Sequence, residues 1–328
     1  MKTILVTGGA GFIGSHTALQ LLKSGLNVCI CDSLVNSSEK TIFQIKKVLE
    51  MDKNIKKGEL FFREGDLRDK KYLFDIFKEF NDNNQRIDAV IHFAGLKSVE
   101  ESLNNPLIYW NVNLMSTINL LEIMESFKCN YLVFSSSATI YKPENNRKIT
   151  EDCLKDPISP YGRTKFAIEK ILEDLFASNT KYWKIANLRY FNPVGSHGSG
   201  LIGENPLNKP NNLFPIICKV ANKEYKELSI FGKDWNTNDG TCIRDYIHVM
   251  DLADAHLSAL NYLQNNSPQI VSLNIGTGKG TSVMEIVNKF VKVNKIKVPY
   301  KFAERRSGDL SCVVADNSLA LKLLGWKP

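Results

Sequence analysis

A tyrosine and a lysine stand four residues apart in the segment SPYGRTKFAIEK, as Tyr161 and Lys165. On a helix, side chains with this spacing lie on the same face. A phenol with a pKa of about 10 is a weak base at neutral pH. A nearby ammonium group stabilises the phenolate and so lowers that pKa. The pair therefore predicts a base that removes the proton of an alcohol.

Two observations strengthen this prediction. None of the other ten tyrosines has a lysine four residues later. In addition, the apolar run NYLVFSSS ends at Ser137, which lies 24 residues before Tyr161. A serine hydroxyl, a phenolate and an ammonium beside a nicotinamide would take a proton and a hydride from an alcohol carbon. The alternative is a buried serine run and an unrelated Tyr–Lys pair on the surface.

A glycine-rich turn follows the first apolar run, in the segment VTGGAGFIGSH, with Gly8, Gly11 and Gly14 three residues apart. Where a strand passes into a helix, free amide groups and the helix dipole favour a diphosphate. Asp32 ends the next apolar run, eighteen residues after Gly14. Its carboxylate can hold the hydroxyls of an adenosine ribose and would repel the extra phosphate of NADP. We therefore expect bound NAD, with a simple packing turn as the alternative.

Other candidate cofactor residues end neighbouring apolar runs. Asp66, in GDLRD, could accept a hydrogen bond from the adenine amino group. Phe93, Ala94 and Gly95 end the run DAVIHFAG with small residues that would let a cofactor lie against the backbone. Each alone could be an ordinary turn, but their place at successive strand ends favours one shared crevice.

The elements that must position these residues alternate along the first half of the chain. Apolar runs rich in Val and Ile, without polar alternation, predict strands that are buried on both faces of a parallel sheet. Amphipathic segments between them predict helices, and this alternation is typical of a doubly wound (Rossmann) α/β domain. The expected strands are residues 2–7, 27–32, 60–66, 88–95, 130–137 and 184–190, and the expected helices 13–25, 71–80, 116–127 and 161–176.

The texture of the sequence changes after about residue 190. The segment 192–212 is rich in Gly, Pro and Asn and is too long for a simple connection, which favours a functional loop. We expect residues 1–188 to form the dinucleotide-binding domain and residues 189–328 a smaller α/β domain that binds the substrate. The run SLNIG at 272–276 is expected to return to the first domain.

The composition argues against several classes of protein. The net charge of +7 comes from scattered Lys and Arg, so we expect neither nucleic acid nor a membrane as a partner. The seven cysteines have no disulfide framework or metal-ligand spacing, which indicates idle thiols in a reducing compartment and no metal site. No run of about 18 apolar residues is present, so we expect a cytoplasmic protein.

The chain resembles the UDP-glucose 4-epimerases, within the extended short-chain dehydrogenase/reductase family, over nearly its whole length. The resemblance rests on the ordered motifs TGGAGFIG, HFAGLKSV, SSSATIY, SPYGRTK, RYFNPVG, PNNLFP, RDYIHVMDLADAH and RRSGDL. The first and fourth are shared across the superfamily, whereas FAGLKSV, SSSATIY and RYFNPVG together are much more specific.

This resemblance implies NAD-dependent epimerisation at C4 of UDP-hexoses through a transient 4-keto sugar. Tyr161 would be the acid/base, Ser137 would orient the 4-hydroxyl, and Lys165 would hold the nicotinamide ribose. Together with the residues from the motifs above, the cofactor set is Gly8, Gly11, Phe12, Ile13, Gly14, Asp32, Asn36, Asp66, Leu67, Phe93, Ala94, Gly95, Lys97, Asn113, Tyr161, Lys165 and Tyr190. The substrate set is Lys97, Ser137, Tyr161, Phe191, Asn192, Asn212, Leu213, Phe231, Arg244, Arg306, Asp309 and Val313.

Two alternatives remain at this point. One is another NAD-dependent nucleotide-sugar enzyme, a 4,6-dehydratase or a decarboxylase. Ala138 and Thr139 stand where dehydratases usually carry acidic residues, which argues against dehydration. The other is a non-catalytic NAD-sensing module, which the intact set of Ser137, Tyr161 and Lys165 disfavours. The resemblance, together with amphipathic helices expected at 112–127 and 161–177, also implies a homodimer. In the family that the chain resembles, the residue four after the aspartate of the RxGD motif borders the 2-position of the sugar. Val313 in place of a bulky tyrosine therefore implies room for an N-acetylated sugar, with a strand valine that faces the core as the alternative.

Overall fold

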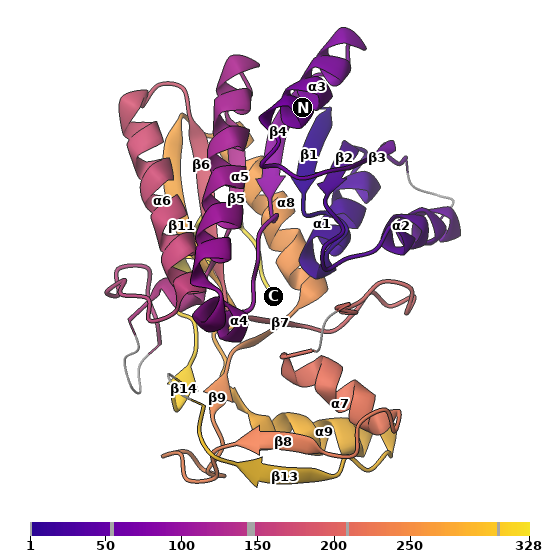
Figure 1. Cartoon of the computed structure of the whole chain (residues 1–328), viewed down its shortest axis with the longest axis vertical. Helices are drawn as coiled ribbons and strands as arrows, with labels where there is room; N and C mark the ends of the chain where they lie inside the picture. The colour runs from indigo at the N-terminus through magenta and orange to yellow at the C-terminus, as the bar shows by residue number, and fades with distance from the viewer. Residues whose placement is uncertain (1, 53–55, 143–147, 208–209, 307–308) are drawn as a thin grey trace.

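The computed structural model describes residues 2–52, 56–142, 148–207, 210–306 and 309–328. In these residues the main sheet has seven strands, all parallel, in the order β11-β6-β5-β4-β1-β2-β3 (Figure 1). This order defines a doubly wound fold and confirms the predicted fold class. The strands are β1 (Thr3–Thr7), β2 (Asn27–Asp32), β3 (Leu60–Glu64), β4 (Ile87–His92), β5 (Tyr131–Ser137), β6 (Lys184–Tyr190) and β11 (Gln269–Ile275).

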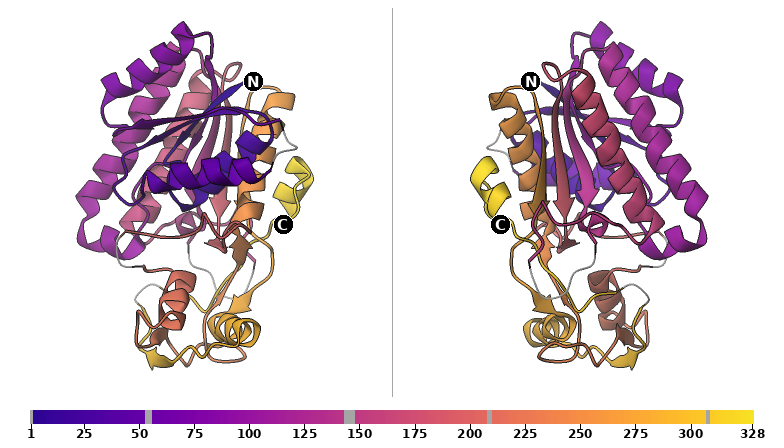
Figure 2. Two further views of the ribbon diagram at one scale, coloured as in Figure 1. Left: turned by 90° about the vertical axis from the view of Figure 1, so that its right-hand side faces the viewer. Right: turned by 90° about the vertical axis from the view of Figure 1, so that its left-hand side faces the viewer.

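Helices cover both faces of this sheet (Figure 2). One face packs against α1 (Phe12–Lys23), α2 (Lys40–Met51), α8 (Val249–Asn265) and α10 (Ser318–Leu324). The other face packs against α3 (Lys70–Asp82), α5 (Pro106–Ser126) and α6 (Pro160–Ser178). The short elements η1 (Ala138–Ile140) and α4 (Val99–Asn104) follow the ends of β5 and β4.

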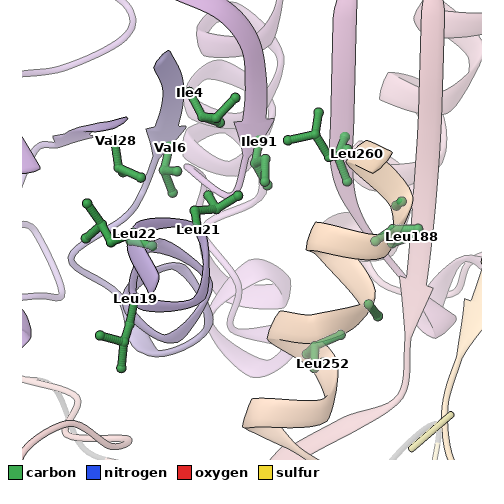
Figure 3. Close-up of a cluster of buried hydrophobic side chains, with 14 of the residues drawn as sticks. Ile4, Val6, Leu19, Leu21, Leu22, Val28, Ile91, Leu188, Leu252 and Leu260 are labelled. Atoms are coloured by element: carbon green, nitrogen blue, oxygen red, sulfur yellow. The ribbon is translucent and has the colours of Figure 1, made fainter. Parts of the chain in front are cut away.

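The core explains why the strands lack polar alternation. Every residue of β1 is buried, because helices pack on both of its faces. Figure 3 shows the α1/α8 face, where Leu19, Leu22 and Leu252 gather with Ile4 and Val6. Burial of such side chains contributes about 1.5–3 kcal/mol each, so this layer fixes the sheet that carries the site.

A smaller lobe lies beyond the carboxyl ends of the main strands (Figures 1 and 2). Its core joins α7 to α9 and includes the buried side chains of Ile217, Leu228 and Val287. The remaining elements are β7 (Asn192–Val194), α7 (Leu213–Ala221), β8 (Leu228–Phe231), β9 (Ile243–Arg244), β10 (Tyr246–His248), β12 (Thr281–Ser282), α9 (Val283–Asn294), β13 (Tyr300–Ala303) and β14 (Cys312–Val313).

The segment after residue 188 contributes to both parts of the molecule. β11, which contains most of the SLNIG run, pairs in parallel with β6 at the edge of the main sheet. Helix α8 packs against α1 on the face of that sheet, and α10 packs against α8 and β11. The division at residue 188 stays a prediction, and the smaller lobe contains only part of residues 189–328. The described residues contain no helix that is long and apolar enough to cross a membrane.

Candidate active site

Helix α6 presents the expected catalytic pair. The Ser159 side chain caps its start by accepting a hydrogen bond from the Gly162 amide at 3.1 Å, and Pro160 occupies the first turn. Tyr161 and Lys165 lie on the buried face of the helix and are 8% and 4% exposed. The Lys165 ammonium donates to the Ser135 carbonyl oxygen at 2.7 Å and lies 4.9 Å from the centre of the Phe134 ring.

Burial dominates the protonation of this pair. It raises the pKa of Tyr161 to about 12, with the hydrogen bond to Ser137 acting in the opposite direction. Burial also lowers the pKa of Lys165 to about 7. The sequence-based expectation that Lys165 brings down the pKa of Tyr161 is therefore wrong for the protein alone. A dry site penalises both charged forms, and the ammonium is bonded to a carbonyl rather than to the phenol.

Ser137 and Tyr190 complete the catalytic end of the sheet, at the carboxyl ends of β5 and β6. The Ser137 side chain is buried at the end of β5, and its oxygen accepts hydrogen bonds from the Thr139 amide at 3.2 Å and hydroxyl at 3.0 Å. These bonds leave its own proton for Tyr161 or a ligand. Tyr190 ends β6 and shares a short hydrogen bond with the Ser135 hydroxyl. Burial and the neighbouring Tyr161 raise the pKa of Tyr190.

The glycine-rich turn needs glycine for close backbone packing at Gly8 and Gly14, and it leaves the start of α1 open at Gly11. Gly8 has a φ of 66°, and a Cβ there would meet the Ala94 amide nitrogen at 2.7 Å. A Cβ on Gly14 would collide with the Gly8 carbonyl oxygen, so these two glycines serve close backbone packing. Gly11 caps α1 without any side-chain hydrogen bond. The first amides of the helix, including Phe12 and Ile13, have no partner within it and suit an anionic group.

The end of β2 has the features expected of an adenosine site. The Asp32 carboxylate accepts hydrogen bonds from the Ala10 and Leu34 amides, both at 2.9 Å, and from the Ser37 hydroxyl at 2.8 Å. Close by in sequence, the Asn36 side-chain oxygen is buried without a partner. Because buried polar atoms are normally paired, this oxygen indicates a missing donor. A ribose hydroxyl would supply one, so these residues fit a dinucleotide.

Asp66 has a partner that the sequence did not indicate. Arg68 clamps its carboxylate with both Nε and a terminal nitrogen, at 2.6–3.1 Å, and this pairing lowers the pKa of Asp66. An open hollow of about 500 Å³ is lined by this pair together with Asp69, Asn111 and Met115. Leu67 is buried under the turn and exposes only 4% of its surface. An adenine in this hollow would have to share the Asp66 carboxylate with Arg68.

The loop after β4 is held from α5. Asn113 is buried and exchanges hydrogen bonds with both backbone groups of Leu96, at 2.8 and 3.1 Å. Gly95 has a φ of 150°, and a Cβ there would lie 2.9 Å from the Asn113 oxygen. Asn113 also donates to Thr164 at 3.0 Å, so its side-chain oxygen and nitrogen both bond protein groups around this loop. The Phe93 ring packs 4.7 Å from that of the buried His256.

Lys97 and Asn212 both contact the carboxylate of Glu204, a residue that no sequence motif marked. The Lys97 ammonium lies 3.6 Å from Glu204, and the Asn212 amide donates to the same carboxylate at 2.5 Å. Asn212 is the N-cap of α7, and its neighbour Leu213 is the first helical residue. Glu204 lies in the glycine-rich segment after β7, and only its loop position in the sequence could have suggested it.

The charged residues assigned to the substrate lie together in the smaller lobe. Arg244 pairs with Asp309 at 2.9 Å and donates to the Leu310 carbonyl at the same distance. The Arg306 guanidinium stacks on the Phe231 ring, with 3.9 Å from its carbon to the ring centre. The structure thus brings these four residues into two adjacent pairs. Spacing in the sequence gave no sign that they would pair with one another.

Phe191, Asn192 and Val313 lie between the main sheet and the lobe. Phe191 is 8% exposed and belongs to a small apolar cluster that Val313 packs against. Asn192 begins β7, and its amide donates to the Asp245 carbonyl at 3.0 Å. Val313 pairs with Arg244 in β14 and β9. The three residues therefore connect the catalytic end of the sheet with the charged pairs.

These features define a dinucleotide-dependent enzyme of the doubly wound class. A Tyr–Lys pair on a capped helix stands beside a serine at a strand end, and an open helix start and an unsatisfied oxygen suit a dinucleotide. The described residues hold no group of three His, Cys, Asp or Glu side chains placed to bind a metal ion.

The chain belongs to the NAD dependent epimerase/dehydratase family, whose model matches residues 4–276. It is 50% identical to "UDP-glucose 4-epimerase 1" of Oryza sativa subsp. japonica, over 100% of this chain and 90% of that protein. A UDP-glucose 4-epimerase from Stenotrophomonas maltophila, crystallised with NAD and formylated UDP-arabinopyranose, is 42% identical with a TM-score of 0.93, over 100% and 93% of the two chains. The UDP-Glc/GlcNAc 4-epimerase of Campylobacter jejuni is 34% identical with a TM-score of 0.82, over 100% and 94%.

Proposed function

We propose that this chain epimerises C4 of UDP-hexoses with NAD, interconverting UDP-galactose and UDP-glucose. The observation that carries the proposal is the buried set of Ser137, Tyr161 and Lys165 at the carboxyl end of the sheet. The high identity to relatives named UDP-glucose 4-epimerase supports the substrate class. A dehydratase would need an acid beside Ser137, where this chain has Ala138 and the hydroxyl of Thr139.

The residues of this chain handle the proton and the orientation of the sugar. Tyr161 accepts the proton of the 4-hydroxyl and returns it, while Ser137 donates a hydrogen bond that orients that oxygen. Bound NAD would supply the hydride acceptor and a positive charge that favours the Tyr161 phenolate. Lys165, held on the Ser135 carbonyl, would bond the ribose of that cofactor.

Epimerisation returns the hydride that it removes, so the cofactor need not leave between turnovers. Purified protein mixed with UDP-galactose, without added NAD, should therefore form UDP-glucose. Dialysed protein should release close to one NAD per chain when it is unfolded. Protein that binds no NAD and works only with NAD added at millimolar levels would contradict tight retention. A product lighter by one water or one carbon dioxide would indicate the dehydratase or the decarboxylase instead.

The sugar pocket should also admit N-acetylated UDP-hexoses. The family resemblance implies that a bulky tyrosine four residues after the aspartate of the RxGD motif closes the space at the 2-position, and this chain has Val313 there. Val313 packs against the apolar cluster that contains Phe191, which favours a place beside the sugar. The similarity to a UDP-Glc/GlcNAc 4-epimerase also supports the proposal. The wild type should convert UDP-N-acetylglucosamine, and Val313→Tyr should abolish only this activity.

The protein should form a homodimer through α5 and neighbouring helices. Leu107, Ile108 and Met115 of α5 expose 81%, 49% and 43% of their surface, and Leu103 of α4 exposes 56%. Such a group of apolar side chains favours a covered interface. On α6, Ile168 and Leu172 are buried in the core, so its share of the interface rests on partly exposed residues such as Phe166. Light scattering at micromolar concentration should give the mass of two chains, and a monomer would contradict this.

A cytoplasmic location also remains part of the proposal. All seven cysteines lie in the described residues, where none of them forms a disulfide, and five of them are buried. Free thiols persist in a reducing compartment. Fractionation of cells that express the tagged protein would test the location.

A further inference from the structure

A fully buried ion pair lies behind the catalytic helix. Glu169 of α6 and Arg189 of β6 are 0% and 3% exposed. Arg189 donates to both carboxylate oxygens of Glu169, at 2.9 and 2.6 Å. The Ser136 hydroxyl of β5 donates to the same carboxylate at 2.5 Å. Burial alone would lower the pKa of Arg189, but its hydrogen bonds to Glu169 raise that pKa above its usual range.

Each member of this cluster is fixed next to a residue of the site. Ser136 precedes Ser137, and Arg189 precedes Tyr190. Glu169 follows Lys165 by one helical turn and Tyr161 by two. The cluster therefore sets the position of α6 along β5 and β6, the two strands that carry the other groups of the site.

A branch of the same network leads toward the smaller lobe. Arg189 donates to the Tyr141 hydroxyl at 2.9 Å, which in turn donates to the Asn274 side chain at 2.7 Å. Asn274 donates to the Ile149 carbonyl at 2.8 Å. The Ile149 amide donates to the Val314 carbonyl at 2.8 Å. Hydrogen bonds thus lead from α6 to Val314, which directly follows Val313 at the end of β14.

We infer that Glu169 and Arg189 are positioning residues for epimerisation, and that Tyr141 and Asn274 carry this positioning to the sugar-binding segment around Val313. A buried ion pair is a weak source of stability, because the cost of removing both charges from water is close to the gain from pairing. The pair contributes more to geometry, because two parallel hydrogen bonds fix both the distance and the orientation of Arg189 relative to Glu169. The inference rests on the proposed function, because it concerns how the groups of that reaction are held.

The two arms of the network should affect different kinetic constants. Glu169→Gln keeps the shape of the side chain but breaks the charge pairing, and should lower kcat for UDP-galactose by roughly 10- to 100-fold with KM within about two-fold. Tyr141→Phe removes only the hydroxyl that joins Arg189 to Asn274. It should raise KM by roughly five-fold with kcat nearly unchanged.

Two matched variants control for general loss of packing or hydrogen bonding. Leu172→Ala creates a cavity on the buried face of α6. Tyr262→Phe removes a hydroxyl of α8 that donates a hydrogen bond to Gln269 at 3.1 Å. Both should leave KM and kcat per folded protein near the wild-type values. If Glu169→Gln does not fold, Ser136→Ala removes one contact without leaving an unpaired charge, and should lower kcat but not change KM.

The outcomes separate the inference from the function on which it rests. A wild type that does not convert UDP-galactose rejects the proposed function. An active wild type with normal kcat in the folded Glu169→Gln or Ser136→Ala variant overturns the positioning role. Equal losses of kcat in these variants and in Leu172→Ala would also overturn it, because they would show that the ion pair only supports packing.

Discussion

The catalytic end of the sheet and the smaller lobe hold their functional groups in opposite ways. Ser137, Tyr161 and Lys165 are each less than 9% exposed. They are anchored to strand backbone or to one another. In the lobe, the side chains of Arg244 and Asp309 are 13% and 29% exposed and are paired together, and Arg306 is exposed on Phe231.

The difference follows from what each region has to do. Groups that transfer a proton must be held in a fixed geometry. Where water is excluded, their electrostatic interactions are stronger and depend more on orientation. Groups that admit a charged ligand must be reachable from solvent and must exchange their present partners for the ligand. We therefore expect substitutions at the catalytic end to change kcat or stability, and substitutions in the lobe to change KM.

The largest effect should come from Tyr161→Phe. The substitution removes the proton acceptor and leaves the ring in place, so kcat should fall by about 10²- to 10⁴-fold while the fold is kept. Tyr262→Phe is the matched control, because it removes a tyrosine hydroxyl of α8 whose hydrogen-bond partner is Gln269 and not a residue of the site. Steady-state rates with UDP-galactose would check this, and near-normal turnover of Tyr161→Phe would remove the basis for a catalytic role.

The second prediction concerns the stability cost of the buried lysine. The unfolded lysine keeps its proton up to a pH of about 10.4, whereas the folded one loses it near the lowered pKa of about 7. Between these values the folded state binds fewer protons, so this group makes stability rise with pH and imposes its full cost below pH 7. The Lys165→Met variant has no such cost of burying a charge, although it also loses the hydrogen bond to the Ser135 carbonyl oxygen.

Urea unfolding of NAD-depleted protein at pH 6 to 9.5 would measure this effect. Lys165→Met should be more stable than the wild type at pH 6, by on the order of a few kcal/mol, and this advantage should shrink as the pH rises. Parallel curves for the two proteins, or a less stable variant at pH 6, would show that Lys165 is not a buried charge. The variant should still be a slower enzyme, which would separate catalysis from stability at this position.

The contrast between the regions also limits what the sequence could predict. The parallel sheet and the strand-end residues follow from local patterns: apolar runs, a glycine spacing and a Tyr–Lys pair four apart. Helix α2 was not anticipated, and α8 was assigned to the smaller domain although it packs on α1. Its apolar face has the same period whichever surface it covers, so only the tertiary fold decides the partner.

Long-range polar partners were beyond the sequence for a similar reason. The Arg189–Glu169 pair spans 20 residues, and the Arg244–Asp309 pair spans 65. Nothing in local spacing marks such partners, because they depend on how strands and helices are packed. The same holds for burial, which reversed the expected direction of the Tyr161 pKa.

The third prediction tests the open half of the comparison. Arg244→Gln removes a guanidinium that faces a partly exposed carboxylate, and should raise KM for UDP-galactose by roughly 10- to 100-fold, because a charge-assisted hydrogen bond is lost. kcat should stay within a few-fold of the wild type. Arg305→Gln is the matched control, since Arg305 is committed to Asp234 at 3.0 Å and stacks on Trp235. A fall in kcat with unchanged KM would place Arg244 with the catalytic groups instead.

The smallest effect should come from Arg306→Lys. The Arg306 guanidinium carbon lies over the Phe231 ring, 3.9 Å from its centre, and the residue is exposed to solvent. Cation–π contacts at exposed sites contribute about 0.5–1 kcal/mol, and a lysine keeps the charge but loses the planar stack. KM should therefore rise by only about two- to five-fold, with kcat and stability unchanged. A loss as large as that of Arg244→Gln would mean that the stack, and not the charge, organises this end of the lobe. The two regions would then not differ in how they hold their groups, because an exposed contact would be positioned as precisely as the buried catalytic residues.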